Sequence, residues 1–301
     1  MAKSSVVSRL YSDGIACPPR WLPDNVHLEV LHGSIAYGYA NNTSDRDIYG
    51  ICIPPKDLIF PHLAGNIPGF GRQILHFEQY IQHGLHDPHD PQDRTIDLTI
   101  MSIVKFFQLA MDNNPNILDL LFAPHHCILH ITRVGQMIRE KRKMFLHKGC
   151  WHKFKGYAYS QMKKMKDKSP QPGSNRAEDI AQYGYDTKYA AHLVRLLDEV
   201  EQILTTGDLE LGRNAEQLKA IRRGEVPEEK IYEIFNLKEK CLEQVYQDSK
   251  IPWGPDEPAI KQLLIDCLED HFGNLKDAVV VPDNFQQALV DIGRTLKSVG
   301  L

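Results

Sequence analysis

The chain has 301 residues, 42% of them hydrophobic, which is enough for one large folded domain or two ordinary ones. Its net charge of −4 excludes a protein whose whole surface is basic. The sequence contains neither a signal peptide nor an apolar run long enough to cross a membrane, and its six cysteines include no CxxC pair. We therefore expect a soluble cytoplasmic protein with no membrane partner and with reduced, structural cysteines.

Three strands are predicted in the first part of the chain. Residues 26–31 alternate apolar and polar side chains and lead into a tight turn, and residues 47–53 form a second apolar strand that ends at two prolines. Residues 95–100 alternate again, and this alternation places Asp97 on the polar face of the third strand.

The segments around the third strand predict a loop before it and a helix after it. The stretch before it is weakly patterned and rich in glycine and proline, and its His- and Asp-rich run at residues 86–91 predicts a mobile loop. Ser102 can cap a helix that ends near residues 113–115. Strands followed by a helix predict an α/β fold for this part of the chain.

The remainder, from about Arg133 onward, has apolar residues at three- and four-residue spacing, which predicts helices. The polar stretch at residues 167–175 interrupts this pattern and predicts a disordered loop. We expect an α/β domain over residues 1–130 and an all-α domain over residues 131–301. Further helices are expected over residues 177–205, 214–222, 228–248, 257–272 and 284–297.

One segment near the N-terminus combines several features that suit phosphate chemistry. Ten residues separate Ser34 from Asp45, and Asp45 and Asp47 are two positions apart on a strand, so both carboxylates point to the same face. Magnesium usually takes one or two carboxylates together with substrate phosphates. Gly33 lets the backbone approach closely, so the Gly33-Ser34 turn can supply N–H groups and a hydroxyl to a phosphate chain. An isolated DxD pair is usually a solvated turn, but the whole pattern is far more specific.

The Gly33-Ser34 pair followed by Asp45-x-Asp47 resembles the signature of the DNA polymerase β-like nucleotidyltransferase superfamily. Over most of the chain the sequence also resembles predicted nucleotidyltransferases of bacteria and their phages, a DNA polymerase β family of RNA repair pathways. The likeness continues through Ile96-Asp97-Leu98, Asn114-Pro115-Asn116, Lys155-Gly156-Tyr157 and Gly184-Tyr185-Asp186-Thr187-Lys188.

This resemblance implies a palm-like α/β domain that binds ATP or another NTP and two magnesium ions. It implies three metal-binding, catalytic carboxylates, and Asp97 is the natural third partner of Asp45 and Asp47, with Asp119 as the alternative. The metals would activate the attacking hydroxyl and stabilise the leaving pyrophosphate in an in-line displacement.

Two basic features extend the predicted binding site. Lys188, His192 and Arg195 lie at i, i+4 and i+7 of one predicted helix and form a cationic stripe. We expect this stripe to bind the triphosphate or an acceptor's phosphate backbone; the alternative is a solvated helix face paired with Asp198 or Glu199. Residues 139–168 hold eleven Lys or Arg and two acids, a net charge of +9 against −13 for the remainder. Aromatic residues are interleaved there, which suits RNA or single-stranded DNA. The nucleic-acid contacts are expected at Lys163, Lys164 and Lys166.

The function predicted from these features is magnesium-dependent transfer of a nucleoside monophosphate from an NTP to a hydroxyl, with a tRNA-like RNA end as the first expectation for the acceptor. Two alternatives remain open at this point. The acceptor could be a protein side chain or a small molecule, or the chain could be a non-catalytic nucleotide- or RNA-binding module. The paired metal carboxylates favour an enzyme.

Overall fold

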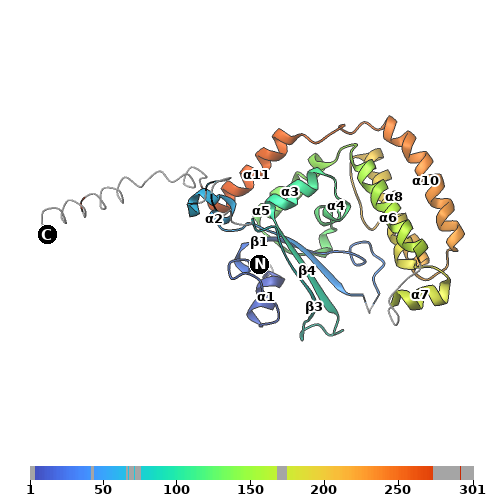
Figure 1. Ribbon diagram of the computed structural model, residues 1–301, viewed down its shortest axis with the longest axis horizontal. Coiled ribbons are helices and arrows are strands. Elements are labelled where there is room, and N and C mark those ends of the chain that lie inside the picture. The colour runs from blue at the N-terminus through green and yellow to red at the C-terminus, as the bar shows by residue number, and fades with distance from the viewer. Residues whose placement is uncertain are drawn as a thin grey trace.

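The computed structural model describes residues 4–41, 44–65, 67, 71, 76–167, 175–273 and 292. Most of the predicted loop at residues 167–175 and of the predicted helix at residues 284–297 lies outside this set. In the described part, a five-stranded mixed sheet with the order β3-β4-β2-β1-β5 lies at the centre of the molecule. Most of the helices gather on one side of this sheet, and α1 lies on the other (Figure 1).

The three central strands agree with the sequence analysis. Strand β1 (Val26–Leu31) pairs antiparallel with β2 (Arg46–Cys52), and β2 pairs in parallel with β4 (Thr95–Ser102). The edge strands β3 (Gln79–His86) and β5 (Ile128–Ile131) were not predicted. Most of β3 is exposed, and β5 is a run of four mostly apolar residues that are all half-buried. Neither strand therefore shows the alternation of a strand with one buried face.

The His- and Asp-rich run after β3 is a turn, as predicted, but ion pairs fix it in place. The Asp87 carboxylate accepts two hydrogen bonds from the Arg9 guanidinium, at 3.0 and 2.6 Å, and Asp90 accepts two from Arg94, at 3.0 and 3.3 Å. Both carboxylates are buried. Arg9 belongs to α1 (Val6–Ser12), so the partner that holds this turn comes from a distant part of the chain.

The two faces of the sheet bury different cores. On one face, Ile48, Leu98 and Ile100 belong to a small core that includes Val7 and Leu10 of α1. On the other face, β-strand residues such as Ile51 belong to a large core shared with the helices. Side chains alternate along a strand, so Asp47 and Asp97 lie on the helix-covered face. The first helices of that layer are α3 (Ile103–Met111), α4 (Pro115–Leu121), α5 (Arg133–Glu140) and α6 (Cys150–Asp167).

The C-terminal helices follow the prediction except at one break. The single helix expected over residues 177–205 is two helices, α7 (Asn175–Tyr183) and α8 (Thr187–Thr206). Gly184 between them has a φ of 81°, and the Asp186 carboxylate caps α8 by accepting the Tyr189 N–H at 3.0 Å. The remaining helices are α9 (Ala215–Arg222), α10 (Glu228–Asp248), α11 (Glu257–Phe272) and the short α2 (Lys56–Ile59).

One hydrophobic core joins residues from both sides of position 130, from Leu28 of β1 to Leu268 of α11. Helices α10 and α11 form an arc along the outside of the helical layer (Figure 1). The division into domains at residues 1–130 and 131–301 therefore stays a prediction. Short 3-10 helices occupy Pro23–Asn25, Pro61–Ala64, His125–Cys127 and Arg142–Phe145.

Candidate active site

Three carboxylates lie at the ends of two neighbouring strands. Asp47 of β2 and Asp97 of β4 are direct partners in the parallel register of these strands, and both are half-buried on the helix-covered face. Asp45 lies just before β2, where its Oδ1 accepts a hydrogen bond from the Thr95 hydroxyl at 2.5 Å. Strand pairing thus brings the distant Asp97 to the Asp45-x-Asp47 motif.

The charges at this edge interact with one another. Burial raises the pKa of Asp47 above its usual value, and the negative charges of Asp97 and Asp45 raise it further. The positive charge of Lys188 acts in the opposite direction and lowers the Asp47 pKa. Lys188, at the start of α8, is therefore close enough to Asp47 to influence its pKa.

A histidine that the sequence analysis did not assign to the site lies beside Asp97. His83 Nδ1 is 3.1 Å from Asp97 Oδ2, and the Gly84 N–H donates to Asp97 Oδ1 at 2.8 Å. Both residues belong to β3. Because β3 has no clear strand pattern, the sequence offered no signal that His83 faces this carboxylate.

The glycine-serine turn packs directly against Asp47. Gly33 has a φ of 66°, and a Cβ atom added to it would lie 2.5 Å from Asp47 Oδ2. The Ser34 carbonyl accepts the N–H groups of Tyr39 and Ala40 at 3.0 and 3.1 Å, which closes the turn. Glycine is required at position 33 both for the backbone conformation and for the close approach of the carboxylate.

Asp119, the alternative third carboxylate, lies beneath the site. It is completely buried in α4, where its Oδ2 accepts hydrogen bonds from the Tyr37 hydroxyl at 2.6 Å and from Arg195 Nη1 at 2.7 Å. Asp119 is thus engaged in the interior, whereas Asp97 is aligned with Asp47. The geometry favours Asp97 as the third carboxylate.

The stripe of Lys188, His192 and Arg195 runs inward along α8, from the surface to the core. Lys188 is exposed and His192 is half-buried. Burial lowers the pKa of His192 well below its usual value, and the charges of Arg195 and Lys188 lower it further. The Arg195 guanidinium is buried, so it does not lie on the exposed stripe that the helical spacing predicted.

Most of the basic segment at residues 139–168 is spread over the molecule and paired. Along α6, Lys153 lies 3.3 Å from Asp112 and Lys155 lies 3.0 Å from Glu239. Arg139 donates to the carbonyl oxygens of Leu121 and Ala123.

The C-terminal end of α6, by contrast, lies beside the start of α8. Lys163, Lys164 and Lys166 are exposed there. Lys164 Nζ lies 5.6 Å from the ring of Tyr189, the residue that follows Lys188 in α8. Lys164 therefore lies beside the start of α8, whereas Lys166 Nζ lies 5.2 Å from the centre of the Tyr232 ring in α10.

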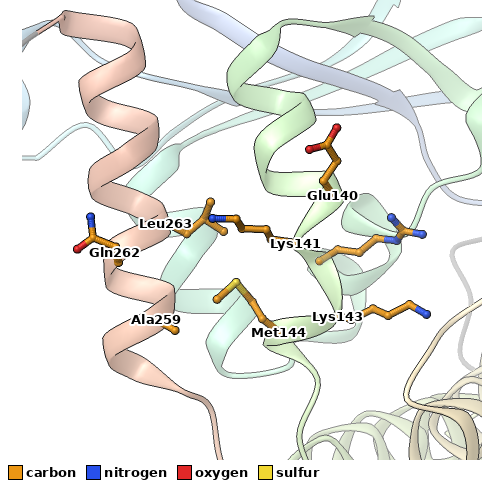
Figure 2. A pocket seen from close by; sticks show the side chains of 8 residues that line it. Glu140, Lys141, Lys143, Met144, Ala259, Gln262 and Leu263 are labelled. Atoms are coloured by element: carbon orange, nitrogen blue, oxygen red, sulfur yellow. The ribbon is translucent and has the colours of Figure 1, made fainter.

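A separate basic pocket of about 480 Å³ lies between the end of α5 and α11. Figure 2 shows Lys141 and Met144 on one side of it, with Ala259 and Leu263 of α11 on the other. Lys141 lies 3.9 Å from Asp266. The pocket contains none of the residues predicted for the active site.

The carboxylate edge suits magnesium in the chemistry of its ligands. Its donors are oxygen atoms, and Asp47 and Asp97 carry like charges that a divalent cation would offset. Within the described residues, however, no three His, Cys, Asp or Glu side chains are arranged so that they could hold a metal ion by themselves. Magnesium usually takes one or two carboxylates together with substrate phosphates, and the Asp47–Asp97 pair offers such carboxylates.

A family model described as "RNA repair pathway DNA polymerase beta family" matches residues 23–253, and the chain belongs to this family. The protein is therefore a nucleotidyltransferase. This finding confirms the resemblance seen in the sequence.

We also compared the chain with solved structures and with curated proteins. The chain is similar to a nucleotidyltransferase-like protein from Exiguobacterium sibiricum 255-15, with 11% sequence identity and a TM-score of 0.28. That match covers 87% of this chain and 72% of the other. No curated protein matches the chain.

Across the part of the chain that the structure describes, no helix combines the length and the apolar character needed to cross a membrane.

Proposed function

We propose that the protein transfers a nucleoside monophosphate from an NTP to a hydroxyl group at an RNA end, releases pyrophosphate and depends on magnesium. The observation that carries this proposal is the alignment of Asp47 with Asp97 on adjacent parallel strands, beside the Gly33 turn and within reach of the Lys188 charge. This edge of the sheet combines carboxylates that suit a metal ion, a turn that suits phosphate and the positive charge of Lys188.

Each residue has a role that follows from its position. Asp45, Asp47 and Asp97, together with the substrate phosphates, would hold two magnesium ions, which would supply charge stabilisation at the phosphate and activation of the attacking hydroxyl. Residues Gly33 and Ser34 bind the phosphate chain through backbone N–H groups and a hydroxyl, because Gly33 leaves no side chain in the way.

The start of α8 binds the triphosphate from the opposite side. Lys188 contributes a flexible positive charge, which suits phosphate oxygens. His192 is kept neutral by burial and by neighbouring cations, so one of its ring nitrogens carries a hydrogen and donates to a phosphate oxygen.

The acceptor is proposed from the family description and from the lysines at the end of α6. The family is placed in an RNA repair pathway. The exposed Lys163, Lys164 and Lys166 lie at the end of α6, where Lys164 is beside Tyr189 of α8. From this end of α6 they can contact the phosphates of an RNA end that enters the site.

The test is a transfer assay with each of the four α-labelled NTPs, a pool of small RNAs and magnesium, followed by sequencing of the labelled RNA. We expect label at RNA ends, no label when EDTA is present, and a preference for one or two NTPs. Label on protein or on a small-molecule hydroxyl would overturn the RNA acceptor and retain the chemistry. NTP binding without any transfer would instead support a binding module.

A further inference from the structure

A buried polar network lies between the Gly33 turn and α8, directly beneath the candidate active site. Tyr37 of the turn donates its hydroxyl hydrogen to Asp119 of α4 at 2.6 Å. Arg195 of α8 donates to the same Asp119 oxygen at 2.7 Å and to Glu199 at 2.8 Å. The Arg195 guanidinium also lies 4.2 Å from the centre of the Tyr37 ring. Two contacts thus join the turn to α8.

The network also reaches the strand that carries Asp47. His32, just before Gly33, stacks on Tyr49 of β2 with ring centres 4.2 Å apart, and its Nε2 lies 3.9 Å from Asp119. Tyr49 is two positions from Asp47 and on the same face of β2. One cluster of polar side chains therefore contacts the turn, the metal-binding strand and α8.

Stability alone does not explain such a cluster. Tyr37, Asp119, Arg195 and Glu199 are each at most 5% exposed, so two acids and one base have been removed from water. Asp119 Oδ1 and Arg195 Nε have no hydrogen-bond partner within the described residues. Apolar side chains of similar volume usually give at least equal stability at such a position. Directional hydrogen bonds differ from apolar contacts because they fix one relative placement of the elements that they join.

We infer that Tyr37, Asp119 and Arg195 are positioning residues that lock the Gly33 turn to α8, so that Lys188 and His192 face the carboxylates across the bound nucleotide. This inference rests on the proposed nucleotidyl transfer. It assigns Arg195 a role that acts through other residues, in place of the direct nucleotide contact that its helical spacing predicted. None of the three residues needs to touch the nucleotide for this role.

The most selective test is Tyr37→Phe, which removes one hydroxyl and keeps the aromatic ring under the Arg195 guanidinium. Binding of magnesium–ATP, or of the NTP that gives the fastest transfer, is measured by calorimetry, and kcat and KM are measured with the same NTP. We expect kcat/KM to fall between about 10- and 100-fold, mainly through a higher KM, because small misplacements of binding groups have effects of this size.

Two further variants complete the test. Arg195→Lys keeps the charge but lacks the planar fork, so we expect it to raise KM in the same way as Tyr37→Phe. Tyr159→Phe is the matched control, because its hydroxyl also donates to a carboxylate, that of Glu239 at 2.6 Å, outside the network. It should leave NTP binding and KM unchanged.

The outcomes separate the inference from the proposed function. A lower melting temperature of Tyr37→Phe with wild-type KM and NTP affinity would overturn the positioning role and leave a structural one. A wild-type protein that neither binds nor transfers any NTP would overturn the proposed function, and this inference with it. A raised KM in both Tyr37→Phe and Arg195→Lys, but not in Tyr159→Phe, supports the positioning role.

Discussion

At the scale of single residues, Asp45 and Asp47 each contribute a carboxylate to the same edge of the sheet. Replacing either by asparagine removes the negative charge and keeps the shape of the side chain. We expect Asp45→Asn and Asp47→Asn to lower the transfer rate at least about 100-fold, since losses of even secondary groups around metals reach that size. The fold should persist, because Asp47→Asn also removes the repulsion that raises the Asp47 pKa. Transfer assays and thermal melts check both expectations.

The control for these variants is Asp57→Asn, which changes an exposed aspartate in the first turn of α2. It should transfer at the wild-type rate. Wild-type rates in Asp45→Asn or Asp47→Asn as well would show that the metal assignment is incorrect.

Gly33 gives a second prediction at this scale. In Gly33→Ala the new Cβ would lie 2.5 Å from Asp47 Oδ2, so the carboxylate or the turn must move. We expect a loss of transfer together with destabilisation of about 1–2 kcal/mol from the left-handed backbone. Both are measured on the purified variant, by transfer assay and by denaturant unfolding.

Gly14→Ala is the matched control because Gly14 has a similar φ of 71° but no atom within 4 Å of the added Cβ. It should lose comparable stability and keep its transfer rate. If Gly33→Ala also kept its rate, close packing of the turn on Asp47 would have no role in the reaction.

At the scale of elements, the end of α6 carries the predicted RNA contacts. Replacing Lys163, Lys164 and Lys166 together by glutamine should weaken RNA binding and reduce the slope of log affinity against log salt by roughly 2, as expected for three fewer phosphate contacts on a single strand. Magnesium–NTP binding should change little, because it depends on other groups. RNA binding is measured by fluorescence anisotropy over a range of salt concentrations.

The double variant Lys153→Gln/Lys155→Gln serves as the control on the same helix. Both lysines are paired, with Asp112 and Glu239, nearer the other end of α6. An equal loss of RNA affinity in the control would mean that binding follows overall charge rather than a surface next to the active site.

At the scale of the whole molecule, the contact between His27 and His271 links the sheet to the last helix that the structure describes. His27 Nδ1 lies 2.8 Å from the Thr132 hydroxyl, and its Nε2 lies 3.1 Å from His271 Nδ1. Burial and, to a smaller extent, the charge of the neighbouring His271 lower the pKa of His27 to about 3. Because both rings are held close, protonation of this pair opposes the docking of α11 on β1.

This contact predicts that the protein loses stability in mild acid. Between pH 6.5 and 3 an unfolded His27 binds a proton that the folded His27 does not, so the free energy of unfolding falls as pH is lowered. One such group contributes up to about 1.4 kcal/mol per pH unit. Above pH 6.5 both states are neutral at this position and the dependence disappears.

Denaturant unfolding at pH 7 and pH 5 checks this prediction. Wild type should be less stable at pH 5, and His27→Gln should show a smaller difference between the two values. An equal difference in both proteins would assign the acid sensitivity to other groups, among them His32 and His192, whose pKa values burial also lowers.

Local patterns in the sequence were sufficient for the central strands, for α9 to α11 and for the Gly33-Ser34 and Asp45-x-Asp47 motif. These features depend on apolar periodicity, capping and turn chemistry within a few residues, all of which can be read along the chain. The same spacing placed Lys188, His192 and Arg195 on one face of α8, as the helix has them.

Tertiary packing decided what those local patterns could not. Strand pairing aligned Asp97 with Asp47 and brought β3, with His83, against it. Burial made Arg195 an internal partner of Asp119, although its helical spacing is equally consistent with an exposed cation. The reason is physical: a helical period gives the direction of a side chain from its own axis, whereas its exposure and its partners depend on which distant segment packs against that face.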